Sequence, residues 1–191
     1  MSTQIRRAVL ADRLWPTKRV AGQATIVLAG SVLVALSAQI SFPLPFTPVP
    51  LTAQTFGVLL VGVLLGPWRG ALSLLLYLAE GAVGLPVFAG FSGGVAHLLG
   101  PSGGYLVGFV GAAAVSGWLA QRGWDRSFVK TSLTMAAGNA AIYVIGVPWL
   151  AGYVSWERAL ALGLFPFLAG DVIKLLLAAW LLPTLWDSTK R

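Results

Sequence analysis

Long apolar runs with almost no charge follow one another along this sequence, and only short polar segments separate them. Of the 191 residues, 57% are hydrophobic and 10% are charged, whereas ordinary soluble domains carry about 25% charged residues. A membrane-spanning helix needs about 20 apolar residues, so the chain has room for about six or seven spans and none for a separate soluble domain. We therefore predict an all-α integral membrane protein.

The apolar runs predict six transmembrane helices, at roughly 20–40, 53–65, 71–84, 105–120, 131–147 and 166–186. The transmembrane domain then covers residues 20–186, between a basic leader at 1–19 and a short tail at 187–191. Proline is tolerated in the first turn of a helix but disrupts its interior. We accordingly expect Pro148 to end the fifth helix, Pro166 to begin the sixth, and the segment 66–70 to form a tight turn.

Positively charged residues are distributed unevenly among the predicted loops. If the N-terminus is cytoplasmic, all of the 13 Lys and Arg residues except Arg158 and Lys174 fall in cytoplasmic segments. This asymmetry is the positive-inside signature of membrane proteins. It predicts that both termini are cytoplasmic, and the expected location is a bacterial cytoplasmic (inner) membrane. Nucleic-acid binding would need basic residues clustered on a soluble face, so it is not expected.

Two opposite charges interrupt the last apolar run. Asp171 and Lys174 are three residues apart, a spacing that places both side chains on one face of a helix. A charge at the bilayer centre costs roughly 2.5–3.5 kcal/mol on insertion scales, which favours a functional role. Asn139 and Tyr143, in the fifth span, are expected at a similar depth. The four side chains predict an outward-facing ligand site, and the alternative is an ion pair that only locks helices together.

Two outward loops would border this site. The segment 42–50 contains four prolines, Pro43, Pro45, Pro48 and Pro50, and is predicted to be extended and non-helical. The segment 85–104 is uncharged and rich in glycine. Irregular backbone near a membrane must be buried in protein or line a cavity, so we expect this loop to contribute to the pocket. The segment 149–163 carries aromatic residues and suits a membrane interface.

Small residues recur every four positions at the start of the first span, at Ala21, Thr25 and Ala29. Such stripes let helix backbones approach closely. Internal packing is the usual role of such a stripe, and a docking face for a membrane partner is the alternative. Among the small-residue stripes of this sequence, the one on the first helix is the better docking candidate, because terminal helices are often peripheral.

Several kinds of chemistry are excluded or weakly indicated. The sequence has no cysteine and no G-x-x-x-x-G-K-[ST] motif, so any ATP hydrolysis must come from another subunit. No metal site is predicted, since His97 is the only histidine and no cluster of metal-ligating residues accompanies it. Ser92 and Ser102 lie in G-x-S-G patterns, which leaves a rhomboid-like intramembrane serine protease as the alternative enzyme reading. The roles of Glu80 and Gln54 stay open, as pocket residues or interface residues.

Four segments together resemble a known family: TPVPLTAQTFGVLL (47–60), GPWRGALSLLLYLAEGAVGLPVFAGFSGG (66–94), LLGPSGGYLVGF (98–109) and PFLAGDVIKLLLA (166–178). They are similar, in the same order, to BioY, the biotin-binding substrate (S) component of energy-coupling factor (ECF) transporters. The resemblance implies the six-helix S-component fold and partnership with a membrane coupling subunit and two cytoplasmic ATPases. It also implies that the proline-rich loop acts as a gate and that the stripe on the first helix contacts the coupling subunit.

The resemblance implies biotin as a non-covalent ligand, with no cofactor, and the candidate residues suit its chemistry. A carboxylate such as Asp171 accepts two charge-assisted hydrogen bonds, which matches the ureido N–H groups. Lys174 suits the ligand carboxylate or the ureido carbonyl, and Asn139 and Tyr143 can add hydrogen bonds. The remaining expected contacts come from the glycine-rich loop and the residue that follows it: Phe88, Phe91, Ser92 and Tyr105. A different vitamin is the alternative substrate for the same architecture.

Overall fold

The computed structural model describes residues 8–17 and 19–188. Six longer helices form the body of the molecule: α2 (Val20–Gln39), α3 (Gln54–Leu65), α4 (Pro67–Ala82), α6 (Gly103–Ala120), α7 (Phe128–Ala151) and α9 (Phe165–Ser188). The shorter elements are α1 (Leu10–Leu14), β1 (Ser41–Phe42), β2 (Leu51–Thr52), η1 (Ala89–Phe91), α5 (Val95–Leu98) and α8 (Trp156–Gly163). The six longer helices correspond one to one with the six predicted spans.

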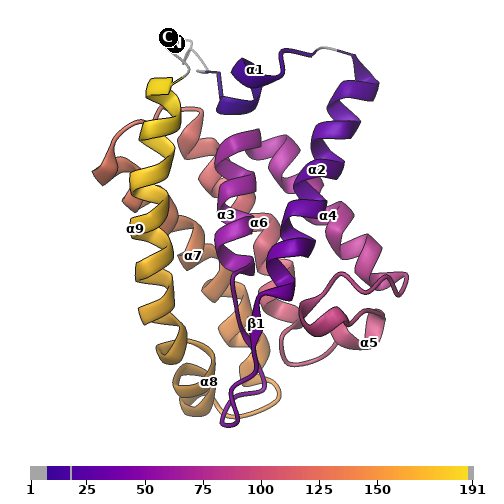
Figure 1. Cartoon of the computed structure of the whole chain (residues 1–191). Helices are drawn as coiled ribbons and strands as arrows, with labels where there is room; N and C mark the ends of the chain where they lie inside the picture. Colours follow the sequence, from indigo (N-terminus) through magenta and orange to yellow (C-terminus); the bar gives the residue numbers. More distant parts are fainter. Residues whose placement is uncertain (1–7, 18, 189–191) are drawn as a thin grey trace, which may run out of the picture.

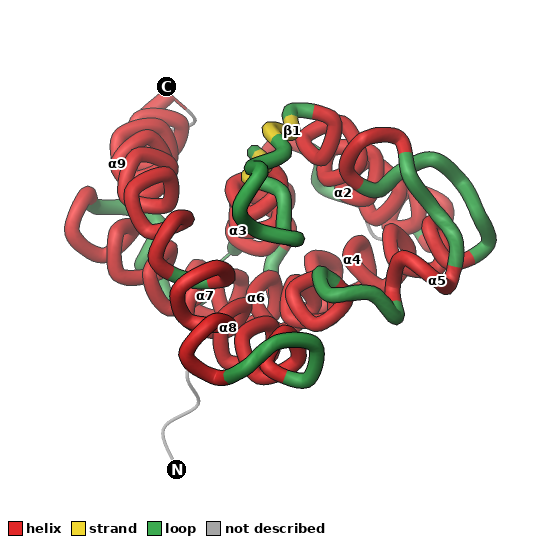
Figure 2. Tube along the Cα trace, turned by 90° about the horizontal axis from the view of Figure 1, so that it is seen from below, coloured by secondary structure: helices red, strands yellow, loops and turns green. Residues whose placement is uncertain are grey.

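Helix α6 is at the centre of the bundle, where it packs against α3, α4 and α7 (Figure 2). Glycines allow this close approach. A Cβ at Gly62 of α3 would lie 2.6 Å from the carbonyl oxygen of Ala113 on α6, and a Cβ at Gly108 of α6 would lie 3.0 Å from that of Ile142 on α7. Small-residue contacts of this kind let helix backbones pack closely without a bulky side chain between them.

The outer surface of the bundle is apolar. Large side chains such as Leu36, Val144 and Trp180 are 64%, 72% and 67% exposed, as expected for a surface that faces lipid rather than water. Within the described residues, four helical stretches are long and apolar enough to cross a membrane: Val20–Gln39, Gly103–Ala120, Phe128–Ala151 and Trp156–Ser188. Helix α3 is apolar but shorter. The general prediction of a helical, multi-pass membrane protein is confirmed.

The proline-rich segment forms the loop of a small hairpin at one end of the bundle (Figure 1). Strands β1 and β2 pair antiparallel, with Ser41 opposite Thr52 and Phe42 opposite Leu51. The Thr47 hydroxyl donates to the carbonyl of Leu162, 2.8 Å away, and so ties the loop to α8. The prediction of an extended, non-helical loop is therefore confirmed, and this tertiary contact holds the loop next to α8.

Two local predictions were wrong. Helix α7 continues through Pro148 to Ala151, because proline removes only one ladder hydrogen bond and Leu150 beyond it is fully buried. The predicted turn at 66–70 shrinks to Gly66, whose φ of 84° reverses the chain before Pro67 starts α4. The segment 149–163, which was predicted to suit a membrane interface, contains α8, and Ser155 caps this helix by accepting from the Arg158 N–H.

The two ends of the chain are described only in part. Residues 1–7 and 18 of the predicted leader, and 189–191 of the predicted tail, lie outside the described residues. Within the leader, α1 packs against α3, and Val9 and Leu10 are buried. Arg69 of α4 forms an ion pair of 2.7 Å with Asp12 of α1. This part of the leader therefore belongs to the folded bundle.

Candidate functional site

A cavity of about 600 Å³, including its open mouth, lies at the hairpin end of the bundle. Its wall combines α3, α6, α7 and α9 with both predicted loops. The lining residues are Val49, Pro50, Thr52, Gln54, Thr55, Ala89, His97, Ser102, Tyr105, Leu106, Phe109, Ile142, Tyr143, Phe167, Asp171 and Lys174. The pocket is mostly apolar with a few converging polar groups, the composition typical of a small-molecule site.

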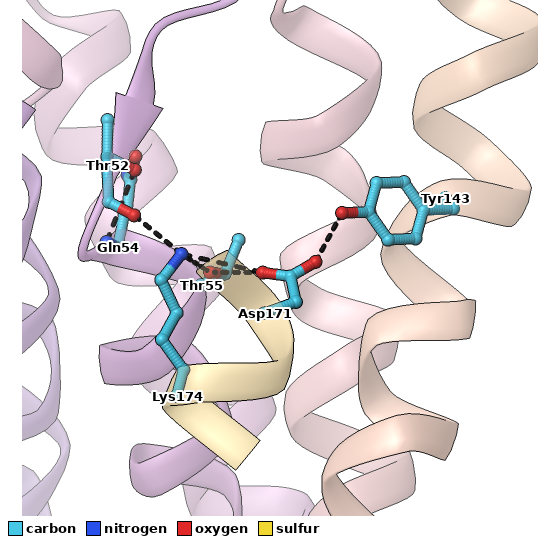
Figure 3. A network of polar contacts seen from close by, with 6 residues as sticks. All are labelled: Thr52, Gln54, Thr55, Tyr143, Asp171 and Lys174. Atoms are coloured by element: carbon cyan, nitrogen blue, oxygen red, sulfur yellow. Dashed lines mark hydrogen bonds and ion pairs between the residues drawn. The ribbon is translucent and has the colours of Figure 1, made fainter. Parts of the chain in front are cut away.

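Asp171 and Lys174 face this cavity from α9 (Figure 3). Lys174 Nζ lies 3.5 Å from Asp171 Oδ1, and the side chains are only 18% and 8% exposed. The spacing of three residues therefore brings the two charges together on one helix face, as the sequence predicted. A buried charge without a partner is strongly disfavoured, so each charge makes the other tolerable at this depth.

Two threonines complete the polar cluster on the α3 side. Lys174 Nζ donates to the carbonyl of Thr52 and to Thr55 Oγ1, both at 2.8 Å. Thr55 Oγ1 also lies 3.5 Å from Asp171 Oδ1. The sequence analysis did not single out these threonines. Only Thr55 carried a signal, as a polar residue near the start of an apolar helix, because Thr52 contacts Lys174 through its backbone carbonyl.

Tyr143 of α7 approaches Asp171 from the other side, and its hydroxyl donates to Asp171 Oδ2 (Figure 3). Tyr105 meets Tyr143 edge-on, with ring centroids 6.4 Å apart. Because the Tyr105 hydroxyl donates to the carbonyl of Gly163 at 2.9 Å, its contribution to the cavity is mainly its ring. Asn139 is buried but does not line the cavity, and its Oδ1 has no hydrogen-bond partner among the described residues.

The glycine-rich loop contributes residues that differ from those singled out. Ala89 and His97 line the cavity, whereas Phe88, Phe91 and Ser92 are not part of its wall. Phe88 is fully buried and stacks on the His97 ring with centroids 5.1 Å apart. Phe91 is 71% exposed. The loop therefore lines the cavity with a small and a polar residue, while the buried ring of Phe88 packs on the side of the loop away from the cavity.

Ser92 does not have the arrangement of a nucleophile. Its Oγ lies 3.2 Å from His97 Nδ1, but its hydroxyl donates to the carbonyl of Ala89 at 2.8 Å. An activated serine needs its proton directed to a base that a third group orients.

The other residues singled out lie as follows. Pro50 lines the cavity, and Pro43, Pro45 and Pro48 are exposed on the hairpin loop. Gln54 also lines the cavity, and its Nε2 donates to the Tyr77 hydroxyl. Glu80 instead accepts from the Ser31 hydroxyl across the contact between α2 and α4. No group of three or more His, Cys, Asp or Glu residues that could hold a metal ion occurs within the described ranges.

The stripe of small residues lies on an open face of α2. Ala21, Thr25 and Ala29 are all exposed, and the Thr25 hydroxyl donates back to the Ala21 carbonyl of its own helix at 3.0 Å. The stripe is therefore not consumed by internal packing of this chain.

The sequence profile of the BioY family matches residues 7–191. The chain belongs to the BioY family. It is 44% identical to the probable biotin transporter BioY of Pyrococcus horikoshii, over 81% of this chain and 90% of that protein. It is 43% identical to the biotin transporter BioY of Thermotoga maritima, over 78% of this chain and 86% of that protein.

A solved structure supports the same placement. The S-component for biotin from an ECF-type ABC transporter matches with a TM-score of 0.75 at 26% sequence identity, covering 87% of this chain and 92% of that one. These proteins are transporter components, so this family member is not an enzyme, and the protease alternative is discarded.

Proposed function

We infer that this protein captures biotin and mediates its uptake as the substrate-specific subunit of an ECF-type transporter. The observation that carries this conclusion is the cluster of Asp171, Lys174 and Tyr143 inside an otherwise apolar cavity. Biotin combines a ureido ring, an apolar thiophane ring and a carboxylate tail. Its binding site therefore needs hydrogen-bond donors and acceptors beside an apolar wall. The family membership and the names of the relatives agree with this chemistry.

Asp171 is the proposed acceptor for the ureido N–H groups, because a carboxylate accepts two charge-assisted hydrogen bonds. Lys174 is the proposed partner of the ureido carbonyl or the ligand carboxylate. Phe109, Phe167 and the ring of Tyr105 supply apolar surface for the thiophane ring. The proposed contribution of the glycine-rich loop, with Phe88, Phe91 and Ser92, is to hold the wall formed by Ala89 and His97. Asn139 is a proposed contact that would require the helices around it to shift.

The proposed topology has six membrane helices (α2, α3, α4, α6, α7 and α9), with both termini in the cytoplasm and the protein in the cytoplasmic membrane. The structure supports an even number of crossings, since α2 begins and α9 ends at the same end of the bundle (Figure 1). The positive-inside distribution supports the orientation. The hairpin and the glycine-rich loop then face outward, with the proline-rich loop as the proposed gate of the cavity.

The orientation can be tested directly because the native chain has no cysteine. In intact cells, a membrane-impermeant thiol reagent is expected to label Pro45→Cys and to leave Arg122→Cys unlabelled until the membrane is permeabilised. The reverse pattern would refute the orientation.

The proposed partners are a membrane coupling subunit and two cytoplasmic ATPases. The chain itself has no Walker A motif, and the exposed face of Ala21, Thr25 and Ala29 offers a surface on which another helix could pack closely. Leucine at Thr25 would disrupt such a surface, because a bulky side chain holds two helices apart. We expect Thr25→Leu to prevent copurification with the coupling subunit while biotin binding by the isolated chain stays unchanged.

Biotin binding tests the proposed function. Purified protein in nanodiscs is expected to bind radiolabelled biotin in equilibrium dialysis, and Asp171→Asn is expected to weaken binding by about tenfold or more, since hydrogen bonds to charged groups contribute roughly 1.5–3 kcal/mol. Ser132→Ala is the matched control, because the Ser132 hydroxyl bonds only to its own helix, at Phe128. Binding of radiolabelled riboflavin or thiamine that excess biotin does not displace would instead establish the alternative of a different vitamin.

A further inference from the structure

The side chain of Gln39 clamps the glycine-rich loop from the end of α2. Its Nε2 lies 3.3 Å from the carbonyl oxygen of Val87 and 3.2 Å from that of Phe88. Its Oε1 accepts from the backbone N–H of Phe91 at 3.0 Å. A side-chain amide is the neutral group that donates from one atom and accepts at the other. Rotating this amide by 180° would face oxygen with oxygen, so the contacts themselves determine its orientation.

The clamped segment is strained. Gly90 and Phe91 adopt φ angles of 68° and 55°, a left-handed conformation that is unfavourable for a residue with a side chain. The Phe91 side chain is 71% exposed, so its own packing does not hold this conformation. Such strain persists only where surrounding contacts enforce it. The bond from Phe91 to Gln39 is one such contact, and the pairing of Phe88 with Ser92 closes the loop from within.

The clamp leads directly to the cavity. Ala89 lies inside the clamped segment and lines the cavity. The Phe88 ring stacks on His97, which also lines the cavity, and it rests against Gly81 so closely that any side-chain carbon there would overlap the ring. Movement of residues 87–91 would therefore move two parts of the pocket wall together.

A second contact, which begins at a cavity-lining residue, also holds Val87. The carbonyl of Val87 also accepts from the Tyr77 hydroxyl at 3.2 Å, and that hydroxyl accepts from Gln54, which lines the cavity. Val87 is thus held both by α2 and by a chain of hydrogen bonds that begins at the pocket. The same chain of contacts reaches the charge pair, since the Gln54 N–H donates to Thr52 Oγ1 at 3.2 Å and Lys174 Nζ donates to the carbonyl of Thr52 at 2.8 Å.

We propose that Gln39 is a positioning residue that latches the glycine-rich loop over the cavity and slows the escape of the bound ligand. This inference rests on the proposed function, with biotin as that ligand. Gln39 does not line the cavity, so we expect it to act on the rate of release rather than as a direct contact of the ligand. Helix α2 also carries Ala21, Thr25 and Ala29 on its exposed face, so displacement of this helix would release the loop.

The test measures biotin release from protein in nanodiscs. Gln39→Met keeps the length of the side chain but neither donates nor accepts. Gln39→Asn keeps an amide at the helix end but is one methylene too short to reach the loop. We expect both variants to release radiolabelled biotin about tenfold faster than the native protein, because loss of one or two hydrogen bonds corresponds to this change. The association rate is expected to change by less than about twofold.

Hydrogen exchange of the empty protein provides the second measurement. The amides of residues 87–92 are expected to exchange faster in both Gln39 variants and at the native rate in the Ser132→Ala control. A purely structural role would instead reduce the number of binding sites while the remaining sites release biotin at the native rate, and that result would overturn the proposal. Faster exchange with unchanged release would overturn it as well, since the loop would then not control the ligand.

The two proposals fail in different ways. If the native protein binds no biotin, the proposed function is wrong, and exchange at 87–92 still decides whether Gln39 restrains the loop. If the native protein binds biotin and both Gln39 variants release it at the native rate, only the latch is wrong.

Discussion

Replacing Lys174 by methionine removes the cation beside Asp171 and leaves most of the side-chain volume in place. At a separation of 3.5 Å, two unit charges attract by about 5 kcal/mol at an effective dielectric constant near 20. Removal of water from both charges offsets part of this attraction, and deletion of one partner of a buried pair typically costs 3–5 kcal/mol. The substitution also leaves the carbonyl of Thr52 without its 2.8 Å donor. We expect a loss of roughly 4 kcal/mol in the free energy of unfolding.

Thermal unfolding in detergent measures this loss. For a chain of about 200 residues, roughly 4 kcal/mol lowers the Tm by about 8–16 °C. The double variant Asp171→Asn/Lys174→Met removes both charges and is expected to recover most of the loss, because replacing a whole buried pair by neutral groups is often close to neutral in stability. Additive effects of the two single substitutions, with a coupling energy below about 0.5 kcal/mol, would refute the reasoning.

Three further predictions concern other parts of the molecule. Gly62→Leu forces α3 away from Ala113 of α6. In thermal unfolding it should lower the free energy of unfolding by roughly 1–3 kcal/mol or prevent folding. Gly111→Leu is the control, since a Cβ there meets no atom. Burial lowers the pKa of His97, so as the pH falls the open loop takes up a proton before the closed loop does. Protection of residues 88–97 from hydrogen exchange should therefore be full above pH 6.5 and fall toward pH 5.5. The substitution His97→Gln should abolish this change. Burial raises the pKa of Asp125, whose Oδ2 accepts a hydrogen bond from Trp186 Nε1. Asp125→Asn should shift the Tm by less than about 3 °C, whereas Trp186→Phe should lower the free energy of unfolding by roughly 1–3 kcal/mol.

The helices and the charged site were predictable from the sequence because the membrane imposes strong rules on both. A bilayer requires apolar runs of a given length, and a charge within such a run needs a partner. The pairing of Asp171 with Lys174 follows from helix geometry, and Tyr143 follows from its depth in a neighbouring span. These three residues could be placed in the site without knowing the conformation of the loops.

The loop residues could not be predicted in the same way. Whether Phe88 or Ala89 faces the cavity depends on the left-handed turn at Gly90 and Phe91, and no periodic pattern encodes such a turn. The missed role of Thr55 depends on how the proline-rich hairpin brings the start of α3 against α9. Pro148 misled the prediction because tertiary packing of α7 outweighed the loss of one hydrogen bond. Local rules were sufficient within helices and insufficient where tertiary contacts determine the conformation.

The contacts within the cavity indicate which end of biotin each charge would hold. An ammonium group has three donors, and those of Lys174 already face Thr52, Thr55 and Asp171. Asp171 has a strong donor only at Oδ2, from Tyr143, while the contacts of Oδ1 with Thr55 and Lys174 are both 3.5 Å long. Asp171 therefore retains acceptor capacity for the ureido N–H groups, whereas Lys174 would have to give up a bond to hold the ligand carboxylate.

Biotin methyl ester distinguishes the two roles of Lys174, because it lacks the negative charge and keeps the ureido ring. If Lys174 mainly holds Asp171 in its charged state, esterification weakens binding by the same factor in the native protein and in Lys174→Met. Affinities from equilibrium dialysis of both ligands with both proteins give this comparison. We expect the two factors to agree within about twofold, a coupling energy below about 0.5 kcal/mol. A loss of tenfold or more that appears only in the native protein would instead place the biotin carboxylate on Lys174.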